Sequence, residues 1–106
     1  MDALRLKFEE HLKEIPGLTV EFWKDTELVC LFFHGKEFAH FHGARILDLR
    51  LSTKIIRQEQ LGREISAEIH PNRSKNSRWI CVELQNESDI GKIIRLVELA
   101  CGELGT

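Results

Sequence analysis

Three strand-like runs follow one another between residues 28 and 51, and this block constrains the fold more than any other part of the sequence. Residues 28–33 are almost entirely apolar, and residues 37–42 follow them after a short turn that contains Gly35, which is typical of a β-hairpin. In residues 46–51 leucine occupies every second position. Because successive side chains of a strand point to opposite faces, this alternation predicts a sheet with one apolar and one polar face.

Segments with helical periodicity and further strand-like runs flank this block. The predicted elements, in chain order, are a helix at 2–14, strands at 18–23, 28–33, 37–42 and 46–51, a helix from Ser52 to near Gly62, strands at 64–70 and 79–84, and a helix from 86–89 to Cys101. This order predicts an α+β fold with a mainly antiparallel sheet of five to six strands and three helices, largely on one face. A length of 106 residues suits one domain, 1–106.

The composition argues against several classes of function. The formal net charge is −2, and the sequence holds no basic field for the phosphates of a nucleic acid. No apolar run approaches the roughly 20 residues of a membrane span, and the N-terminus lacks the apolar segment of a secretory signal. Cys30, Cys81 and Cys101 stand far apart in apolar stretches, so we expect buried free thiols and a cytoplasmic protein.

Several polar and aromatic residues interrupt the apolar pattern of their strands. His40 and His42 stand two apart in a predicted strand, so their imidazoles share one face. Asp48, His70 and Trp79 each lie out of phase with the aliphatic residues of their own predicted strand. An antiparallel sheet can leave one face open to water, so we expect a site on that face.

The pattern does not fix the side on which the histidine pair lies. Phe38 has the same parity as His40 and His42, whereas Ala39 and Phe41 have the opposite parity. Apolar residues therefore point both ways along this strand, and both faces stay open for the pair.

A set of short motifs along the chain resembles the luciferase-domain (DUF5519-like) family of small bacterial and fungal proteins. The matching motifs are Ile15-Pro16-Gly17-Leu18-Thr19-Val20, Glu37-Phe38-Ala39-His40-Phe41-His42, Asp48-Leu49, Arg57, His70-Pro71, Ser77-Arg78-Trp79 and Asp89-Ile90. Their order and spacing together carry the resemblance, which covers most of the chain. The loop before Trp79 departs from the family pattern, because it is rich in arginine, lysine and asparagine. The resemblance implies no light emission, since a flavin-dependent bacterial luciferase is a (β/α)8 barrel of about 250 residues.

We expect a domain that binds a small molecule or an anion on the polar face, with catalysis as a further option. The candidate catalytic residues are His40, His42, Asp48 and His70. Imidazoles titrate nearest to neutral pH, and an aspartate can orient one of them for proton transfer. The candidate ligand-binding residues are Arg50, Arg57, Ser77 and Trp79. Arginine matches anionic groups with two parallel hydrogen bonds, and an indole can form the wall of a pocket.

Three alternatives stay open. A strand His-x-His pair with His70 or Asp48 has the residue types of a metal centre, but the spacing alone is weak, so we assign no metal ligand and no cofactor. Ser77, His70 and Asp48 have the residue types of a catalytic triad, yet no G-x-S-x-G motif is present. The domain could instead be a non-enzymatic interaction or dimerisation module, in which strand 28–33 pairs with a second copy if it lies at a sheet edge.

Overall fold

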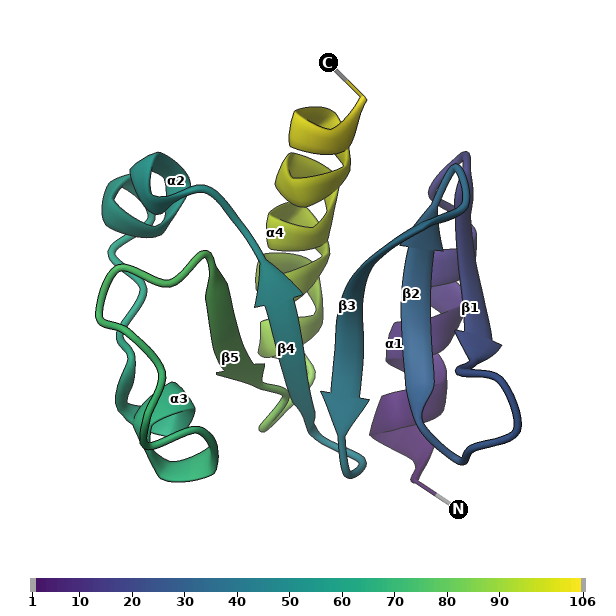
Figure 1. Cartoon of the computed structure of the whole chain (residues 1–106). Coiled ribbons are helices and arrows are strands. Elements are labelled where there is room, and N and C mark those ends of the chain that lie inside the picture. Colours follow the sequence, from purple (N-terminus) through teal and green to yellow (C-terminus); the bar gives the residue numbers. More distant parts are fainter. Residues whose placement is uncertain (1, 106) are drawn as a thin grey trace.

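The computed structural model describes residues 2–105, which form five strands and four helices (Figure 1). In chain order the elements are α1 (Ala3–Lys13), β1 (Leu18–Phe22), β2 (Val29–Phe33), β3 (Lys36–His42), β4 (Ile46–Arg50), α2 (Thr53–Gln58), α3 (Glu64–Ile69), β5 (Trp79–Glu83) and α4 (Ser88–Leu104). The strands form one antiparallel sheet in the order β1-β2-β3-β4-β5. None of the helices within residues 2–105 is long and apolar enough to cross a membrane.

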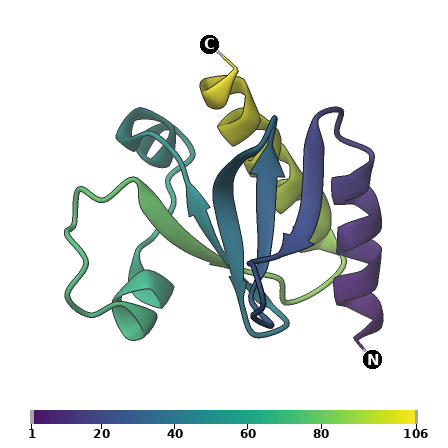
Figure 2. The same ribbon diagram turned by 45° about the vertical axis from the view of Figure 1, so that its right-hand side comes forward.

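The two long helices, α1 and α4, pack against one face of the sheet, which we call the covered face (Figures 1 and 2). Leu31 and Leu49 from the sheet are buried there together with Phe8 of α1 and Val97 of α4. The rings of Phe8 and Phe41 meet edge to face with their centroids 6.1 Å apart. Burial of each large apolar side chain contributes about 1.5–3 kcal/mol, so this layer supplies most of the stability.

The α+β class and the antiparallel sheet are confirmed, but residues 2–105 contain four helices rather than three. The predicted strand at 64–70 is wrong, because Glu64–Ile69 form α3. Ile65 and Ile69 stand four apart as well as in alternation, so a run this short fits a helix as well as a strand. In the helix the buried side chain is that of Ser66.

Two helix ends also differ from the prediction. The helix expected to end near Gly62 ends at Gln58, and Gln60, two residues later, takes a positive φ of 54°. The last helix continues beyond Cys101 to Leu104. Gly102 lies within this added part of the helix. A glycine within a helix costs about 1 kcal/mol relative to alanine, and the packing of α4 on the sheet outweighs this cost.

A β-bulge in β3 decides where its side chains point. Successive residues of β2 pair with Glu37 and Ala39, which leaves Phe38 without a partner. This extra residue shifts the alternation of β3, so Phe38 and Ala39 are both buried in the core. His40 and His42 then alternate with the core residues and lie on the opposite face, which we call the open face. The ambiguity of the histidine pair is therefore resolved by one inserted residue.

The edges of the sheet are β1 and β5, and β2 lies between β1 and β3. The alternative function, dimerisation through strand 28–33, required this strand to lie at an edge of the sheet. Because β2 is an inner strand, that structural basis for dimerisation is wrong. α2 and α3 lie on the other side of the sheet from α1, beyond β5 (Figures 1 and 2). The Cys81 N–H of β5 donates a hydrogen bond to Ser66 Oγ of α3 over 2.9 Å. α3 thus covers part of this edge and occupies a backbone group that another chain could otherwise pair with.

Candidate functional site

One row of residues crosses four strands on the open face. The strand registers place Cys30 opposite His40, His40 opposite Asp48, and Asp48 opposite Cys81. Directly opposed residues of antiparallel strands have Cβ atoms about 4.5–5.5 Å apart, so their side chains meet. The sheet therefore sets an imidazole beside a carboxylate and flanks this pair with two thiols.

Asp48 is the buried centre of this row, with a side chain that is 0% exposed. Its carboxylate accepts two hydrogen bonds from the guanidinium of Arg73, at 2.9 Å to Oδ1 and 2.8 Å to Oδ2. Buried charges are nearly always paired, and a bidentate arginine–carboxylate pair is among the strongest arrangements. Arg73 therefore compensates the charge of Asp48 inside the protein.

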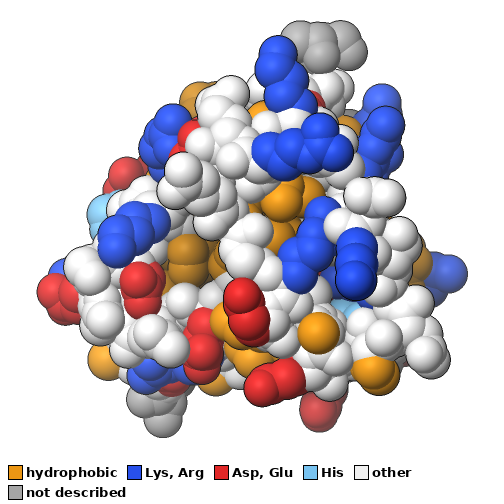
Figure 3. Space-filling view, turned by 90° about the vertical axis from the view of Figure 1, so that its left-hand side faces the viewer, with side chains coloured by type: hydrophobic (Ala, Val, Ile, Leu, Met, Phe, Trp, Pro, Cys, Tyr) orange, Lys and Arg blue, Asp and Glu red, His pale blue; other side chains and the backbone are white. Residues whose placement is uncertain are grey.

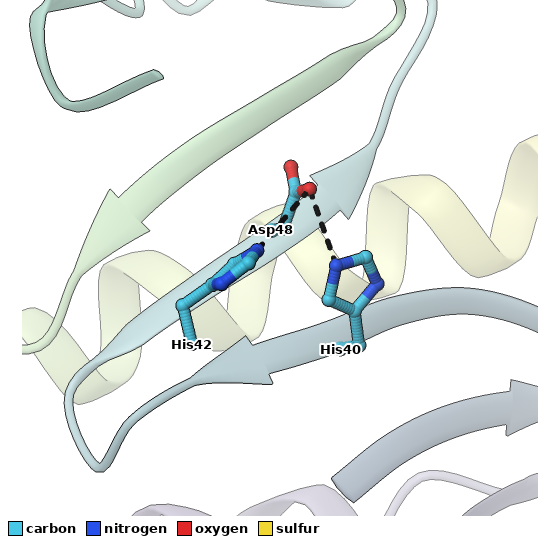
Figure 4. Close-up of side chains that lie close together, drawn as sticks. All are labelled: His40, His42 and Asp48. Carbon is cyan, nitrogen blue, oxygen red and sulfur yellow. Dashed lines mark ion pairs between the residues drawn. The ribbon is translucent and has the colours of Figure 1, made fainter. Parts of the chain in front are cut away.

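Three imidazoles converge on one oxygen of this carboxylate. Asp48 Oδ2 lies 3.3 Å from Nε2 of His40, 3.4 Å from Nε2 of His70 and 3.9 Å from Nε2 of His42. The Nε2 atoms of His42 and His70 are 3.2 Å apart, a hydrogen bond in which one ring donates and the other accepts. Figure 4 shows His40 and His42 extending from β3 toward Asp48 on β4. We refer to these four residues as the histidine–aspartate cluster.

The connection between α3 and β5 brings the remaining side chains to the cluster. His70 follows α3 directly, and its backbone N–H donates a hydrogen bond to the backbone carbonyl of Ser66. The hydroxyl of Ser66 in turn accepts a hydrogen bond from Cys81 of β5. The Arg73 N–H in turn donates to the His70 carbonyl over 3.0 Å. At the start of β5, the ring of Trp79 lies 5.6 Å from that of His40. A chain of local hydrogen bonds therefore positions His70 and Arg73 over the sheet.

The electrostatics of the cluster follow from burial and close contacts. Burial acts to raise the pKa of Asp48, but hydrogen bonds from His40 and Arg73 outweigh it and hold that pKa well below the usual range, so Asp48 is an anion at neutral pH. Burial and the neighbouring imidazoles of His40 and His70 lower the pKa of His42, which favours its neutral form. Burial and the charge of Asp48 raise the pKa of the Cys81 thiol.

The structure brings together all four candidate catalytic residues, His40, His42, Asp48 and His70, and it places Trp79 beside them. The imidazoles stay partly accessible, with exposed side-chain fractions of 21% for His40, 32% for His42 and 31% for His70. These residues therefore meet on the polar face of the sheet, where the sequence predicts a site.

Within residues 2–105, the other three candidate ligand-binding residues make no hydrogen bond or ion pair with the cluster, and of the three only Arg50 lies opposite Trp79 across the sheet. Arg50 is exposed and pairs in register with Trp79 at the end of the sheet. Arg57 is exposed on α2 and lines a separate cleft of about 250 Å³. Within residues 2–105, the hydrogen bonds of Ser77 involve Ser74, Arg63 and the N–H of Trp79, so its hydroxyl serves a local turn rather than the cluster.

Three residues of the site were not in the predicted catalytic or ligand-binding sets. Arg73 pairs with Asp48 across 25 positions of chain, and no spacing rule connects a loop residue to a strand at such a separation. Glu37 Oε2 lies 3.7 Å from Nδ1 of His40, the ring nitrogen on the side away from Asp48. The alternation within residues 46–51 and 79–84 could have placed Cys81 beside Asp48, had the register of the two strands been known.

The side of the molecule that carries α2, α3 and β5 is rich in basic side chains (Figure 3). Lysine and arginine side chains gather over the upper and right-hand parts of this view, and a histidine is visible at the surface beneath them. Acidic side chains lie mainly in the lower part. The loop between α3 and β5 contributes Arg73, Lys75 and Arg78 to this side, although the whole chain has a net charge of −2.

The fold and the cluster together define a small α+β domain with a histidine–aspartate site on the open face of an antiparallel sheet. The family model described as the luciferase domain matches residues 35–100, so the chain belongs to the luciferase-domain family. The match extends from the turn before β3 into α4 and includes every residue of the cluster. No curated protein and no solved structure matches the chain.

Proposed function

We propose that this domain binds a small organic anion on the open face. The imidazoles of the histidine–aspartate cluster hydrogen-bond its polar groups, the indole of Trp79 contacts its flat part, and Arg50 attracts its negative charge. The observation that carries the proposal is the convergence of three partly exposed imidazoles on one fully buried carboxylate oxygen.

A purely structural role for the cluster would need fewer residues. The guanidinium of Arg73 already compensates Asp48 with two hydrogen bonds, so the buried charge is stable without three imidazoles around it. The imidazoles remain partly exposed, which leaves ring atoms accessible from solvent. Ligand sites typically combine an apolar or aromatic wall with a few convergent polar groups, and Trp79 beside His40 supplies that combination.

The charge of the site favours an anion of modest size. Asp48 and Arg73 cancel each other, whereas Arg50 and Arg78 are exposed, Arg50 opposite Trp79 in the strand register and Arg78 next to it in the chain. Arginine binds carboxylates and phosphates with paired hydrogen bonds. A molecule with an acidic group and a flat ring would therefore use both the guanidinium groups and the indole.

The test uses benzoate and inorganic phosphate as probes, with EDTA present so that no metal ion contributes. The imidazole NMR signals of the five histidines report each residue separately, and His11 and His34, which lie outside the cluster, serve as internal controls. We expect benzoate at millimolar concentration to shift the signals of His40, His42 and His70 while those of the two controls stay unchanged. Phosphate, which lacks a ring, should shift them less.

A second measurement isolates the indole. In a Trp23→Phe background, Trp79 is the single tryptophan, so fluorescence reports directly on the proposed pocket wall. Saturable quenching by benzoate that is weakened at least about 10-fold by Arg50→Gln supports the proposal. If neither probe changes the cluster histidines or the Trp79 fluorescence, or if His11 responds as strongly as His42, the proposed function is wrong.

A further inference from the structure

We propose that His40, His42, His70 and Asp48 bind a divalent transition-metal ion of the zinc type. This inference rests on the same cluster as the proposed function but names a ligand that the residue spacing alone did not assign. Two overlapping sets of side chains have ligand atoms within 4.8 Å of one another: His40, His42 and Asp48, and Asp48, His70 and Cys81. Asp48 belongs to both sets, so we place it at the centre of the proposed site.

Three of the distances between the proposed ligand atoms match the edges of a tetrahedral coordination shell. Ligand atoms about 2.0–2.2 Å from a zinc ion stand about 3.3–3.6 Å from one another when the geometry is tetrahedral. The separations from Asp48 Oδ2 to Nε2 of His40 and His70 are 3.3 and 3.4 Å, and His42 Nε2 lies 3.2 Å from His70 Nε2. The separation of 3.9 Å between His42 Nε2 and Asp48 Oδ2 exceeds an ideal edge by a few tenths of an ångström, and the ligand atoms of His40 and His42 lie within 4.8 Å of one another. A metal ion could therefore bind after the imidazole rings close around it.

The surroundings of His40 provide the outer partner that metal-bound histidines usually have. Its Nε2 faces Asp48, whereas its Nδ1 lies 3.7 Å from a carboxylate oxygen of Glu37. A carboxylate near the second ring nitrogen orients the imidazole and directs the other nitrogen to the metal. The bulge in β3 makes this arrangement, because it places Glu37 and His40 on the same face of the sheet although they stand three positions apart.

The guanidinium of Arg73 narrows the choice of metal. Each carboxylate oxygen can accept two bonds, so Asp48 Oδ2 can bind an ion while it still accepts a hydrogen bond from Arg73. The positive charge of Arg73 opposes a second cation nearby, and this disfavours magnesium and calcium, which bind mainly through carboxylate charge. Ions with high affinity for imidazole nitrogen, such as zinc, cobalt and nickel, overcome this repulsion more readily.

The set of nitrogen and oxygen ligands is favoured over a set that includes Cys81. The Cys81 side chain is buried with only 2% of the residue exposed, and its N–H is bonded to Ser66 of α3, which fixes the strand at this point. The imidazoles of His40 and His42 are more accessible and lie where an ion enters from solvent. We therefore assign three imidazoles and one carboxylate as ligands and leave the thiol outside.

The first experiment measures binding of Zn²⁺ alone to EDTA-treated, full-length protein by titration calorimetry. We expect one Zn²⁺ per chain and no saturable binding of Mg²⁺. The His42→Ala variant should lose most of this affinity, whereas the matched control His11→Ala, a change at an exposed position of α1, should bind as the unchanged protein does. Glu37→Gln should weaken binding by about 10- to 100-fold, as expected for an outer partner. Because Asp48→Asn could impair folding, the His42 and Glu37 variants carry the test.

The second experiment uses Co²⁺ as a spectroscopic probe of the ligand set. We expect visible absorption bands of a nitrogen- and oxygen-bound ion that disappear in His42→Ala. Failure of Zn²⁺ to bind with a stoichiometry of one, or equal weakening by His11→Ala and His42→Ala, would overturn the proposal. Strong thiolate-to-cobalt absorption would overturn the assigned ligands in favour of a set with Cys81.

The metal site and the proposed binding of an organic anion can fail separately. The benzoate titration is performed in EDTA and repeated with Zn²⁺-loaded protein. Benzoate binding to the EDTA-treated protein without any Zn²⁺ binding would overturn the metal site alone. Zn²⁺ binding with no response to benzoate in either form would overturn the organic-anion function and leave the metal site standing.

Discussion

The two faces of one five-stranded sheet have opposite chemistry, although each face is built from alternate residues of the same strands. On the covered face, Leu47 and Leu49 of β4 pack with α1 and α4 in an apolar core. On the open face, Asp48, which stands between them in sequence, is buried beneath three imidazoles and the guanidinium of Arg73. Neighbouring residues of a single strand thus serve stability on one side and a polar site on the other.

The difference shows how a small domain can contain a buried charge. Desolvation of a carboxylate costs several kcal/mol, and this cost has to be offset by direct partners. The covered face contributes stability through area that is removed from water, whereas the open face only has to compensate Asp48. Substitutions on the two faces should therefore differ in what they disturb, and the predictions below test this division.

The largest effect is expected on the covered face. Leu49 is fully buried at 0% exposure, so Leu49→Ala should lower the free energy of unfolding by about 3 kcal/mol through lost burial and a residual cavity. Urea denaturation followed by circular dichroism measures this change. Leu28→Ala is the matched control, since Leu28 is 36% exposed and should change stability by less than about 1 kcal/mol. Equal losses in both variants would contradict the assignment of the core to this face.

A second, smaller effect is expected from removal of the partner of Asp48. Arg73→Met should cost about 2 kcal/mol, below the value for a fully buried pair, because the Arg73 side chain is 18% exposed and the imidazoles remain. The double variant Asp48→Leu with Arg73→Met should recover part of this loss, because no uncompensated charge is then buried. Chemical denaturation in EDTA measures the free energy of unfolding of the unchanged protein, the single variant and the double variant. If Arg73→Met is as stable as the unchanged protein, the burial of Asp48 does not depend on Arg73.

The same pair predicts how stability depends on pH. The pKa of Asp48 is lower in the folded protein than in the unfolded chain, so its contribution is fully present above the unfolded value of about 4 and is lost as the pH falls below it. In Arg73→Met, His40 alone remains to oppose the effect of burial, so the pKa of Asp48 should rise and this contribution should shrink. Denaturation curves from pH 5 to about pH 3 compare the two slopes. Parallel slopes would contradict the ion pair as the cause of the low pKa.

The division into two faces could be predicted from the sequence, but the position of the histidines could not. The alternation of leucines with Asp48 in residues 46–51 already separates the faces of β4. In β3 the consecutive apolar pair Phe38-Ala39 interrupts the alternation, and the structure shows that this interruption is a bulge. A break of this kind marks where an extra residue enters, so it is the signal that would have assigned His40 and His42 to the open face.

The part of the site that comes from the connection between β4 and β5 was harder to predict. Residues 64–70 were assigned to a strand, so His70 was expected on the open face for the wrong reason. His70 reaches Asp48 because α3 is anchored to β5 and the chain folds back over the sheet after it. Neither the anchoring by Ser66 nor the pairing of Arg73 leaves a periodic signal, since both depend on tertiary contacts across a loop.

A fourth prediction concerns this anchor between the open face and α3. Ser66→Ala removes the acceptor of the Cys81 N–H and should cost about 1–2 kcal/mol, because a buried backbone donor is left unpaired. Ser77→Ala is the matched control, since its hydroxyl accepts from the more exposed N–H of Trp79. Amide hydrogen exchange at Cys81 should accelerate in the first variant only. Unchanged exchange there would show that α3 does not hold the edge of the sheet.

The smallest effect on stability is expected where the effect on binding is largest. The His42 imidazole is 32% exposed and is not needed to compensate Asp48, so His42→Ala should change the free energy of unfolding of the EDTA-treated protein by less than about 1 kcal/mol. The same substitution should abolish the response to Zn²⁺ described above. A site kept for function tolerates loss of a ligand without loss of fold, whereas a structural cluster loses stability with each member removed. Thermal denaturation with and without Zn²⁺ separates these cases: the unchanged protein should melt at a higher temperature with the ion, and His42→Ala at the same temperature in both conditions. If His42→Ala loses much stability without the ion, the cluster on the open face stabilises the fold as the covered face does, and the proposed difference between the two faces is wrong.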